Sequence, residues 1–240
     1  MSSWLSGVGQ QGNAGILRLR WRFRGAGETR ADLPEVMKTT FGADAPSHSL
    51  PVVDAIVVGA SAGGVEALLK IFSGLRKGFS LPILMVLHLP GDRHSQLANV
   101  FQNRLAIPVK EADDKESIVP GTLYVAPAGY HVSVESDFSL SLSQEDKVFY
   151  SRPSIDILFG SAADAYAPRL AGVLLTGANN DGANGLLQIK KYGGFTVIQD
   201  PAQAQASTMP EAGLALHSPD YLLSLNDIGR LLVELERTAC

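Results

Sequence analysis

DAIVVGASAGG, residues 54–64, is the stretch that decides how this chain folds. A short apolar run leads into a turn of small residues, and VEALLKI at 65–71 follows with helical character. Strand, tight turn and helix therefore succeed one another, with Ser61 at the apex and glycines that tolerate strained backbone angles. Such a turn lifts a hydroxyl beside a helix N-terminus, where N–H groups can stabilise an oxyanion. The pattern matches the G-x-S-x-G nucleophile elbow, and a dinucleotide-binding turn or a plain glycine-rich connection stay open as alternatives.

A histidine and an aspartate follow two further apolar runs. ILMVLH at 83–88 ends in His88, and GVLLT at 172–176 is followed by a polar turn that contains Asp181. Parallel strands of an α/β sheet end at one edge, where such sheets place their ligands, so we expect Ser61, His88 and Asp181 to meet there. A serine hydroxyl needs a base to take its proton, and the base needs an acid to orient it. The chain order Ser, His, Asp differs from the Ser, Asp, His order of α/β-hydrolases, so the fold is not the ordinary hydrolase one.

Six motifs follow one another along the chain: GASAGGVEAL, HLP after the second apolar run, PGTLYVAP, SRPSIDILF, LLTGANNDGANG and MPEA. In this order they resemble the catalytic domain of the CheB-type chemoreceptor protein-glutamate methylesterases, over roughly residues 53–235. The resemblance implies hydrolysis of glutamyl methyl esters on chemoreceptor cytoplasmic helices, with release of methanol and, in many members, deamidation of receptor glutamines. It implies Ser61 as nucleophile, His88 as general base and Asp181 as the orienting acid, without a cofactor. A methylated chemoreceptor is the implied partner, and other chemosensory proteins are further candidates.

Three residues depart from the family pattern around the expected reaction centre. Ala62 stands where a threonine is frequent, Leu87 where a glutamine is frequent, and Ala178 where TGMGxDG has methionine. A backbone N–H can still donate at these points because it does not depend on the side chain. We therefore expect oxyanion donors near Ala62 and Ala178, with Gly63 and Asn180 also lining the site. The departures should affect substrate fit and rate more than reaction type.

Three further residues are candidates for substrate contact, and each has a structural alternative. Arg152 precedes a proline in a polar loop and could bind a substrate carboxylate, or it could pair with Asp156 at a helix entry. His131 could approach the site or be a packed or surface histidine. Met209 could line the cleft, or stand at a helix start with Pro210 in the first turn.

The composition fits a water-soluble enzyme that binds neither nucleic acid nor the membrane interior. The chain has 240 residues, 45% of them hydrophobic, and no unbroken apolar run near the length of a membrane span. Its formal net charge of −4 argues against a general nucleic-acid-binding role. The single cysteine, Cys240, permits neither a disulfide framework nor a cysteine metal cluster and suits the reducing cytoplasm. We expect no metal and no cofactor.

The first fifty residues differ in charge from the rest of the chain. They carry six Lys and Arg against four Asp and Glu, a net charge of +2, which leaves 14 against 20, or −6, for residues 51–240. LRLRWRFR at 17–24 alternates apolar residues with arginine, which fits a docking arm for an acidic partner or simply a flexible chain end. We expect an N-terminal extension over 1–50 and the catalytic domain over 51–240. Fifty residues cannot hold the receiver domain of two-domain relatives. The site should therefore be uncovered, and acetyl phosphate should not change its activity.

Alternating strand and helix patterns predict a doubly wound α/β domain, with a mainly parallel sheet and helices on both faces. Helices are expected over 65–76, 94–104, 154–166, 183–191 and 226–235, and further strands over 123–125, 196–199 and 221–225. Segments 131–135 and 138–142 should form a small antiparallel hairpin, and the acidic run 111–116 should be a solvated turn.

Two other functions remain as alternatives. A dinucleotide-binding turn needs a second glycine where Ser61 stands and an acid at the end of the next strand, where His88 stands. A nucleotide-binding module therefore fits poorly. An esterase of the same fold that acts on another substrate, or a weakly active adaptor of that fold, fits better because Ala62 and Ala178 flank the expected reaction centre.

Overall fold

A computed structural model describes residues 50–88 and 96–239 of the chain. The expected N-terminal extension, with its arginine-rich run, therefore lies outside the described residues, apart from Leu50. The beginning of the helix expected over 94–104 lies outside them as well. Within the described ranges, no helix is both long enough and apolar enough to cross a membrane.

Seven parallel strands form the central sheet, in the order β3-β4-β2-β1-β7-β8-β9. Their bounds are β1 Ala55–Ala60, β2 Ile83–Leu87, β3 Val109–Glu111, β4 Leu123–Val125, β7 Leu170–Leu174, β8 Phe195–Gln199 and β9 Tyr221–Leu223. The chain builds outward from β1 in both directions, first through β2 and later through β7. The carboxyl ends of β1 and β7 therefore flank the topological switch point, where sheets of this kind bind ligands.

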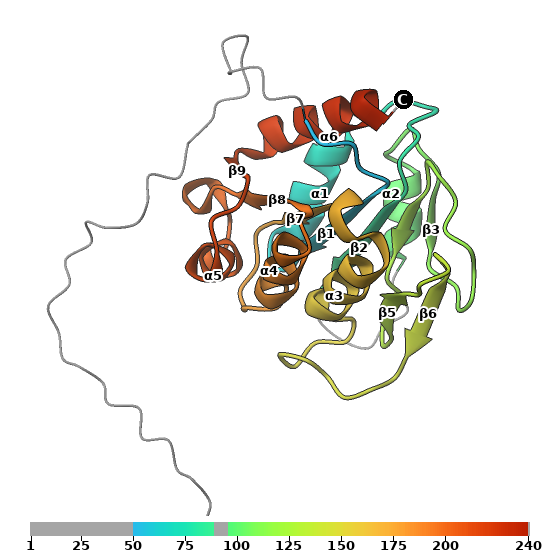
Figure 1. Ribbon diagram of the computed structural model, residues 1–240, viewed down its shortest axis with the longest axis horizontal. Helices are drawn as coiled ribbons and strands as arrows, with labels where there is room; N and C mark the ends of the chain where they lie inside the picture. The colour runs from blue at the N-terminus through green and yellow to red at the C-terminus, as the bar shows by residue number, and fades with distance from the viewer. Residues whose placement is uncertain (1–49, 89–95, 240) are drawn as a thin grey trace, which may run out of the picture. The chain divides into compact units, whose positions relative to one another are not determined.

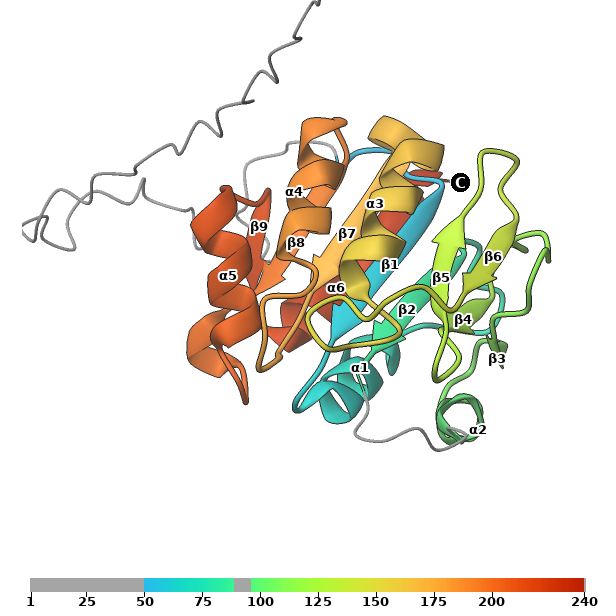
Figure 2. The same cartoon turned by 90° about the horizontal axis from the view of Figure 1, so that it is seen from below.

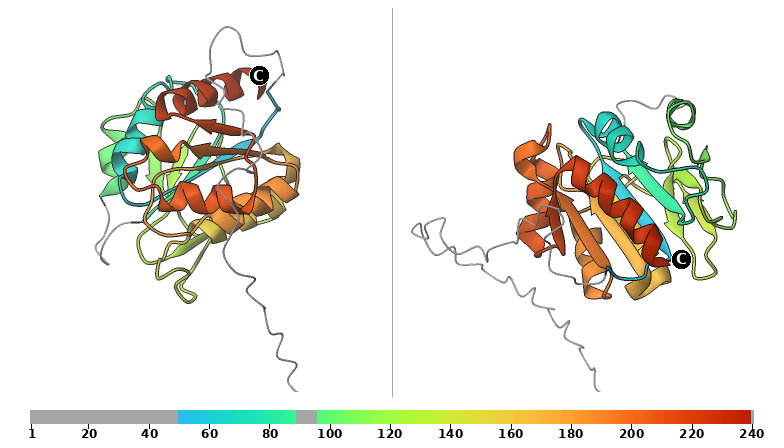
Figure 3. Two further views of the ribbon diagram at one scale, coloured as in Figure 1. Left: turned by 90° about the vertical axis from the view of Figure 1, so that its left-hand side faces the viewer. Right: turned by 90° about the horizontal axis from the view of Figure 1, so that it is seen from above.

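Helices cover both faces of the sheet (Figure 1). One layer holds α1 (Gly64–Phe72), α2 (Leu97–Gln102) and α6 (Leu225–Ala239), and the right panel of Figure 3 views α1 and α6 over the sheet. The other layer, in front in Figure 2, holds α3 (Ile155–Tyr166), α4 (Ala183–Lys191) and α5 (Thr208–Leu216). The antiparallel pair β5 (His131–Val134) and β6 (Leu140–Ser143) packs on the α3 side, and two short 3-10 helices span Ala167–Arg169 and Pro201–Gln203. The prediction of a doubly wound α/β fold with a small hairpin is confirmed.

The two helix layers explain why the central strands are continuous apolar runs. Every residue of β1 is buried, because successive side chains point to opposite faces and both faces are covered. Ile56 and Val58 enter the core beneath α1 and α6, whereas Ala55 and Val57 enter the core beneath α3 and α4. Each fully buried side chain of valine or isoleucine size contributes about 1.5–3 kcal/mol to folding. Packing against both cores holds each central strand in place, and this fixes the positions of the strand ends.

The predicted and observed elements differ mainly at their ends. The strand expected over 172–176 is β7 and ends at Leu174, because the Thr176 N–H donates to the Gln199 side chain at 2.9 Å and leaves the ladder. The helix expected over 65–76 ends at Phe72, and the last helix continues to Ala239. The run at 111–116 is not wholly a turn, since Glu111 ends β3, a three-residue edge strand too short to show periodicity.

Candidate active site

Ser61 and His88 each stand one residue beyond the end of a central strand. Strands β1 and β2 are in register, with Ala60 opposite Leu87, and the His88 N–H donates to the Ala60 carbonyl at 3.1 Å. The Ser61 N–H donates to the Thr176 carbonyl at 2.9 Å, which ties the turn to the chain leaving β7. These backbone bonds place Ser61 between the carboxyl ends of β2 and β7.

The turn after Ser61 brings the N-terminus of α1 against the serine. Gly63 precedes the helix with φ of +78°, a left-handed conformation that glycine adopts without strain. The Gly64 N–H closes the turn by donating to the Ser61 carbonyl at 2.8 Å. Within the described part of the chain, the N–H groups of Ala62 and Gly63 donate to no acceptor. They are therefore free to bind an oxyanion at the positive end of the helix.

The Asp181 carboxylate is fully buried and accepts four hydrogen bonds. His88 Nε2 donates to Oδ2 at 2.9 Å, and the Ser154 hydroxyl donates to Oδ1 at 2.9 Å. The N–H groups of Ile155 and Asp156 donate at 2.7 Å and 3.0 Å. Ser154 is the N-cap of α3, so the carboxylate also lies at the positive end of that helix dipole.

These contacts lower the pKa of Asp181 below its ordinary value. Burial, the largest single influence, raises this pKa because a buried carboxylate loses its hydration. The hydrogen bonds from His88 and from the N–H groups of Asp156 and Ile155, with the charge of His88, together outweigh that influence. Asp181 is therefore an ionised acceptor that can fix an imidazole ring and stabilise it when it becomes charged.

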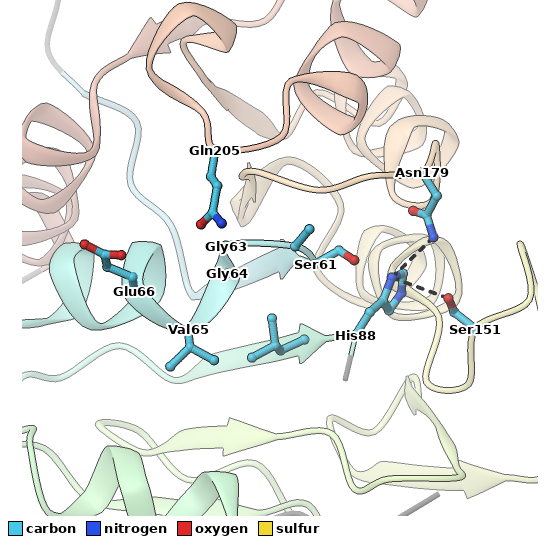
Figure 4. Close-up of a pocket in the computed structure, with 11 residues that line it drawn as sticks. Ser61, Gly63, Gly64, Val65, Glu66, His88, Ser151, Asn179 and Gln205 are labelled. Atoms are coloured by element: carbon cyan, nitrogen blue, oxygen red, sulfur yellow. Dashed lines mark hydrogen bonds between the residues drawn. The ribbon is translucent and has the colours of Figure 1, made fainter. Parts of the chain in front are cut away.

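The His88 ring directs Nε2 toward Asp181 and Nδ1 toward Ser151 and Asn179. When Nε2 donates to Asp181, Nδ1 carries the lone pair and can act as a base. Nδ1 lies 3.4 Å from the Ser151 hydroxyl and 3.5 Å from the Asn179 amide nitrogen. Figure 4 shows the Ser61 hydroxyl pointing toward the same ring, although no hydrogen bond joins these two described side chains. Catalytic hydrogen bonds often tighten only when substrate binds.

A pocket of about 570 Å³ opens where these groups meet (Figure 4). It is lined by Ser61, Ala62, Gly63, Gly64, Val65, Glu66, Leu87, His88, Ser151, Asn179 and Gln205. The Ser61 hydroxyl, the His88 ring and the free backbone donors therefore border one cavity, and acyl transfer needs groups of these three kinds close together. Among the residues that the structure describes, no three His, Cys, Asp or Glu side chains are grouped to hold a metal ion.

The loop after β7 contributes a different residue from those expected. Ala178 and Asn180 are exposed and are absent from the pocket lining, whereas Asn179 between them lines it. The expected lining by Ala178 and Asn180 is therefore corrected to Asn179.

His131 does not reach the pocket. It is fully buried, where its Nδ1 accepts from the Ser154 N–H at 3.1 Å and its Nε2 donates to the Asp146 carbonyl at 3.1 Å. Both ring nitrogens are thus used by the backbone. Of the two alternatives for His131, the packed histidine is therefore the one found, and its ring holds the residue that caps α3.

Arg152 and Met209 lie outside the pocket lining too. Arg152 donates to the carbonyls of Gln144 and Glu145 at 2.8 Å and 2.9 Å, and no described ion pair joins it to Asp156, whereas the substrate contact stays a prediction. Met209 is fully buried in the first turn of α5 and packs on Gly177, where it supports the loop from behind.

Thr176, Ser151 and Ser154 are site residues that the sequence analysis did not identify as such. The Thr176 hydroxyl donates to the Ala62 carbonyl at 2.8 Å and accepts from the Ala206 N–H at 2.9 Å. It therefore joins the nucleophile turn to the loop before α5. The only sequence signal for these residues is a hydroxyl next to a strand end or a helix start, which is too common to be diagnostic.

Comparisons with known proteins agree with this geometry. The model of the CheB methylesterase family matches residues 56–232. A Leptospira interrogans protein, provisionally named protein-glutamate methylesterase/protein-glutamine glutaminase, is 42% identical over 184 residues, which are 77% of this chain and 95% of that protein. The protein-glutamate methylesterase FrzG of Myxococcus xanthus is 33% identical over 184 residues, 77% of this chain and 55% of FrzG.

A solved structure also matches the fold. The crystal structure of the Thermotoga maritima CheB methylesterase catalytic domain superposes with a TM-score of 0.72 at 31% identity. The match covers 77% of this chain and all of that domain. The chain therefore belongs to the CheB methylesterase family and is a carboxylic ester hydrolase of the protein-glutamate methylesterase type.

Proposed function

We propose that this chain hydrolyses γ-glutamyl methyl esters on chemoreceptors, with Ser61 as nucleophile, His88 as general base and Asp181 as the acid that orients His88. One observation carries the proposal: the Ser61 hydroxyl, the His88 ring and the unused N–H groups of Ala62 and Gly63 border one pocket. The names of the relatives supply the substrate class, a glutamyl methyl ester in a protein.

In the first step the Ser61 oxygen attacks the ester carbonyl carbon. Nδ1 of His88 takes the hydroxyl proton, and Asp181 stabilises the imidazolium through the bond to Nε2. The carbonyl oxygen becomes negative, and the N–H groups of Ala62 and Gly63 are placed to bind it. The nitrogen roles are exchanged relative to the serine-protease arrangement, in which Nδ1 faces the acid.

In the second step the bond to the methoxy oxygen breaks, and the imidazolium proton goes to that oxygen to release methanol. A glutamyl ester of Ser61 remains. Water then attacks the ester carbonyl while His88 takes a proton from it, and the proton returns to Ser61 as the receptor's glutamate side chain leaves. The same acyl-enzyme forms from a glutamine side chain with loss of ammonia, which agrees with the double name of the Leptospira relative.

The partner in this proposal is a methylated chemoreceptor, and other proteins of the same chemosensory system are further candidates. FrzG of Myxococcus xanthus carries the methylesterase name and has similar sequence along 77% of this chain. Receptor helices labelled on their methyl groups are therefore the substrate to test first.

Methanol release from methylated receptor by Ser61→Ala tests the proposal. We expect turnover to fall by about 10⁴-fold or more, because the residues of such a site act as a unit. Ser218→Ala is the matched control, since Ser218 is exposed in the loop just before β9, at the sheet edge away from the pocket. Undiminished methanol release by the Ser61 variant would contradict the proposal, whereas ammonia release from receptor glutamine reports the second reaction separately.

A further inference from the structure

A two-residue hairpin turn stands beside the pocket. Val148 and Ser151 form an antiparallel bridge, with the Val148 N–H donating to the Ser151 carbonyl at 3.1 Å and the reverse bond at 2.8 Å. The two residues between them, Phe149 and Tyr150, have φ of 47° and 62°. Two positive φ values in a two-residue loop define a type I′ turn.

The residues of this turn are poor choices for its backbone. Type I′ turns favour Asn-Gly or similar pairs, and a bulky residue in the left-handed region is strained. Packing gives Tyr150 almost no compensation, because its side chain is 97% exposed, and Phe149 is still 42% exposed. Backbone strain of this kind gathers at functional sites and ligand clamps. The turn therefore presents two aromatic side chains at the surface, one of them almost wholly exposed, in a backbone conformation that such residues disfavour.

The position of the turn links it to the chemistry. Ser151, the residue after Tyr150, lines the pocket and places its hydroxyl 3.4 Å from Nδ1 of His88 (Figure 4). Consecutive Cα atoms are about 3.8 Å apart, so Tyr150 begins at the rim of the pocket. The turn therefore lies beside the pocket that an ester must enter to reach Ser61.

We propose that Phe149 and Tyr150 bind the protein segment that carries the ester, by packing on the apolar surface of the substrate helix next to the modified glutamate. The inference rests on the proposed function. A pocket of about 570 Å³ holds a side chain, whereas a helix is about 10 Å across and must lie on the rim. The formal net charge of −4 gives no overall attraction to a glutamate-bearing segment. Exposed aromatic rings supply contact area that does not depend on charge.

The test replaces the pair with the residues that the turn itself favours, Phe149→Asn together with Tyr150→Gly. This variant keeps the type I′ backbone and removes both rings. We expect kcat/KM on methylated receptor to fall about tenfold, mostly through KM, because the lost contact is uniform binding. We expect kcat/KM on a small N-acetylated glutamate γ-methyl ester to stay unchanged. Tyr192→Ala is the matched control, since Tyr192 is 49% exposed at the far end of α4 from the pocket.

The outcomes separate this inference from the proposed function. An equal loss on receptor and small ester would show that the turn positions Ser151 and His88, which would overturn a docking role. An unchanged KM for receptor would overturn it as well. Dissociation of a dimer in the variant, measured by sedimentation, would assign the rings to a second copy instead. If the unaltered protein releases no methanol from receptor, that result contradicts the proposed function, and this inference fails because it depends on that function.

Discussion

The two sides of the pocket are built differently. On the acid side, Asp181 is fully buried and accepts four hydrogen bonds, two of them from the first turn of α3. On the nucleophile side, Ser61 is half-buried and Ala62 is exposed, and the N–H groups of Ala62 and Gly63 donate to nothing among the described residues. In the proposed reaction, the Asp181 carboxylate keeps its hydrogen bonds throughout, and it is fully hydrogen-bonded in the structure. The Ser61 hydroxyl and the N–H groups of Ala62 and Gly63 would change partners, and they have no partner among the described residues.

This contrast separates stability from activity. A fully bonded buried carboxylate contributes to both, because its donors would be left unpaired without it. A half-buried serine hydroxyl outside any described hydrogen bond contributes to activity alone. Substitutions on the two sides should therefore differ in unfolding experiments even where they are equally harmful to turnover.

The largest combined effect on turnover and stability is expected for Asp181→Asn. Turnover should fall about 10⁴-fold, because an asparagine amide donates to Nε2 and moves the ring proton to Nδ1, where no lone pair is left for the Ser61 proton. The free energy of unfolding should also fall, by about 1–3 kcal/mol, since the amide cannot accept all the bonds that the carboxylate accepts. Urea unfolding and methanol release measure the two effects. Ser61→Ala is the comparison, and a loss of stability as large as that of Asp181→Asn would contradict the contrast.

Ionisation of Asp181 should also make the free energy of unfolding depend on pH. The pKa of Asp181 is lowered in the folded chain, so its ionised form favours folding above the unfolded pKa of about 3.9. That contribution should be constant at higher pH and should be lost as pH falls toward the folded pKa. The difference in unfolding free energy between the unaltered protein and Asp181→Asn should therefore shrink below about pH 4. A difference that grows on acidification would contradict the lowered pKa.

The rule that parallel strands end at one edge of a sheet predicts much of the site. It placed Ser61, His88 and Asp181 at one sheet edge, and the structure brings His88 and Asp181 into contact and Ser61 into the same pocket as His88. This works because the direction and burial of β1, β2 and β7 follow from their apolar runs. The sheet, with its layers on both faces, follows from the same runs.

The positions of strand ends do not predict which way the side chains of a loop point. Asn179, rather than Ala178 or Asn180, lines the pocket, and the spacing from a strand end does not encode which loop residue does so. The contact between Ser154 and Asp181 joins residues 27 positions apart and depends on how α3 packs against the loop after β7. Which nitrogen of His88 faces the acid depends on the same packing.

A smaller effect is expected for Thr176→Val on the nucleophile side. The change keeps the shape and removes the hydroxyl that ties the Ala62 carbonyl to the Ala206 N–H. We expect kcat to fall about tenfold because the oxyanion donors shift, with a stability loss of about 1 kcal/mol. Thr196→Val is the matched control, since its buried hydroxyl bonds Asp220 at the start of β8. A similar fall in kcat for both variants would show a general loosening of the fold.

The smallest effects are expected for Ser151→Ala and Asn179→Ala. Both side chains lie near Nδ1 of His88 at long distances, 3.4 Å and 3.5 Å, where a hydrogen bond is weak. They compete with Ser61 for one lone pair, so removing either should leave stability unaltered and change kcat by less than about threefold. Single-turnover methanol release measures this directly. A fall of about 10²-fold or more for Asn179→Ala alone would instead identify its amide as an oxyanion donor. The open side of the pocket would then contain a side-chain donor beside the N–H groups of the Ser61 turn.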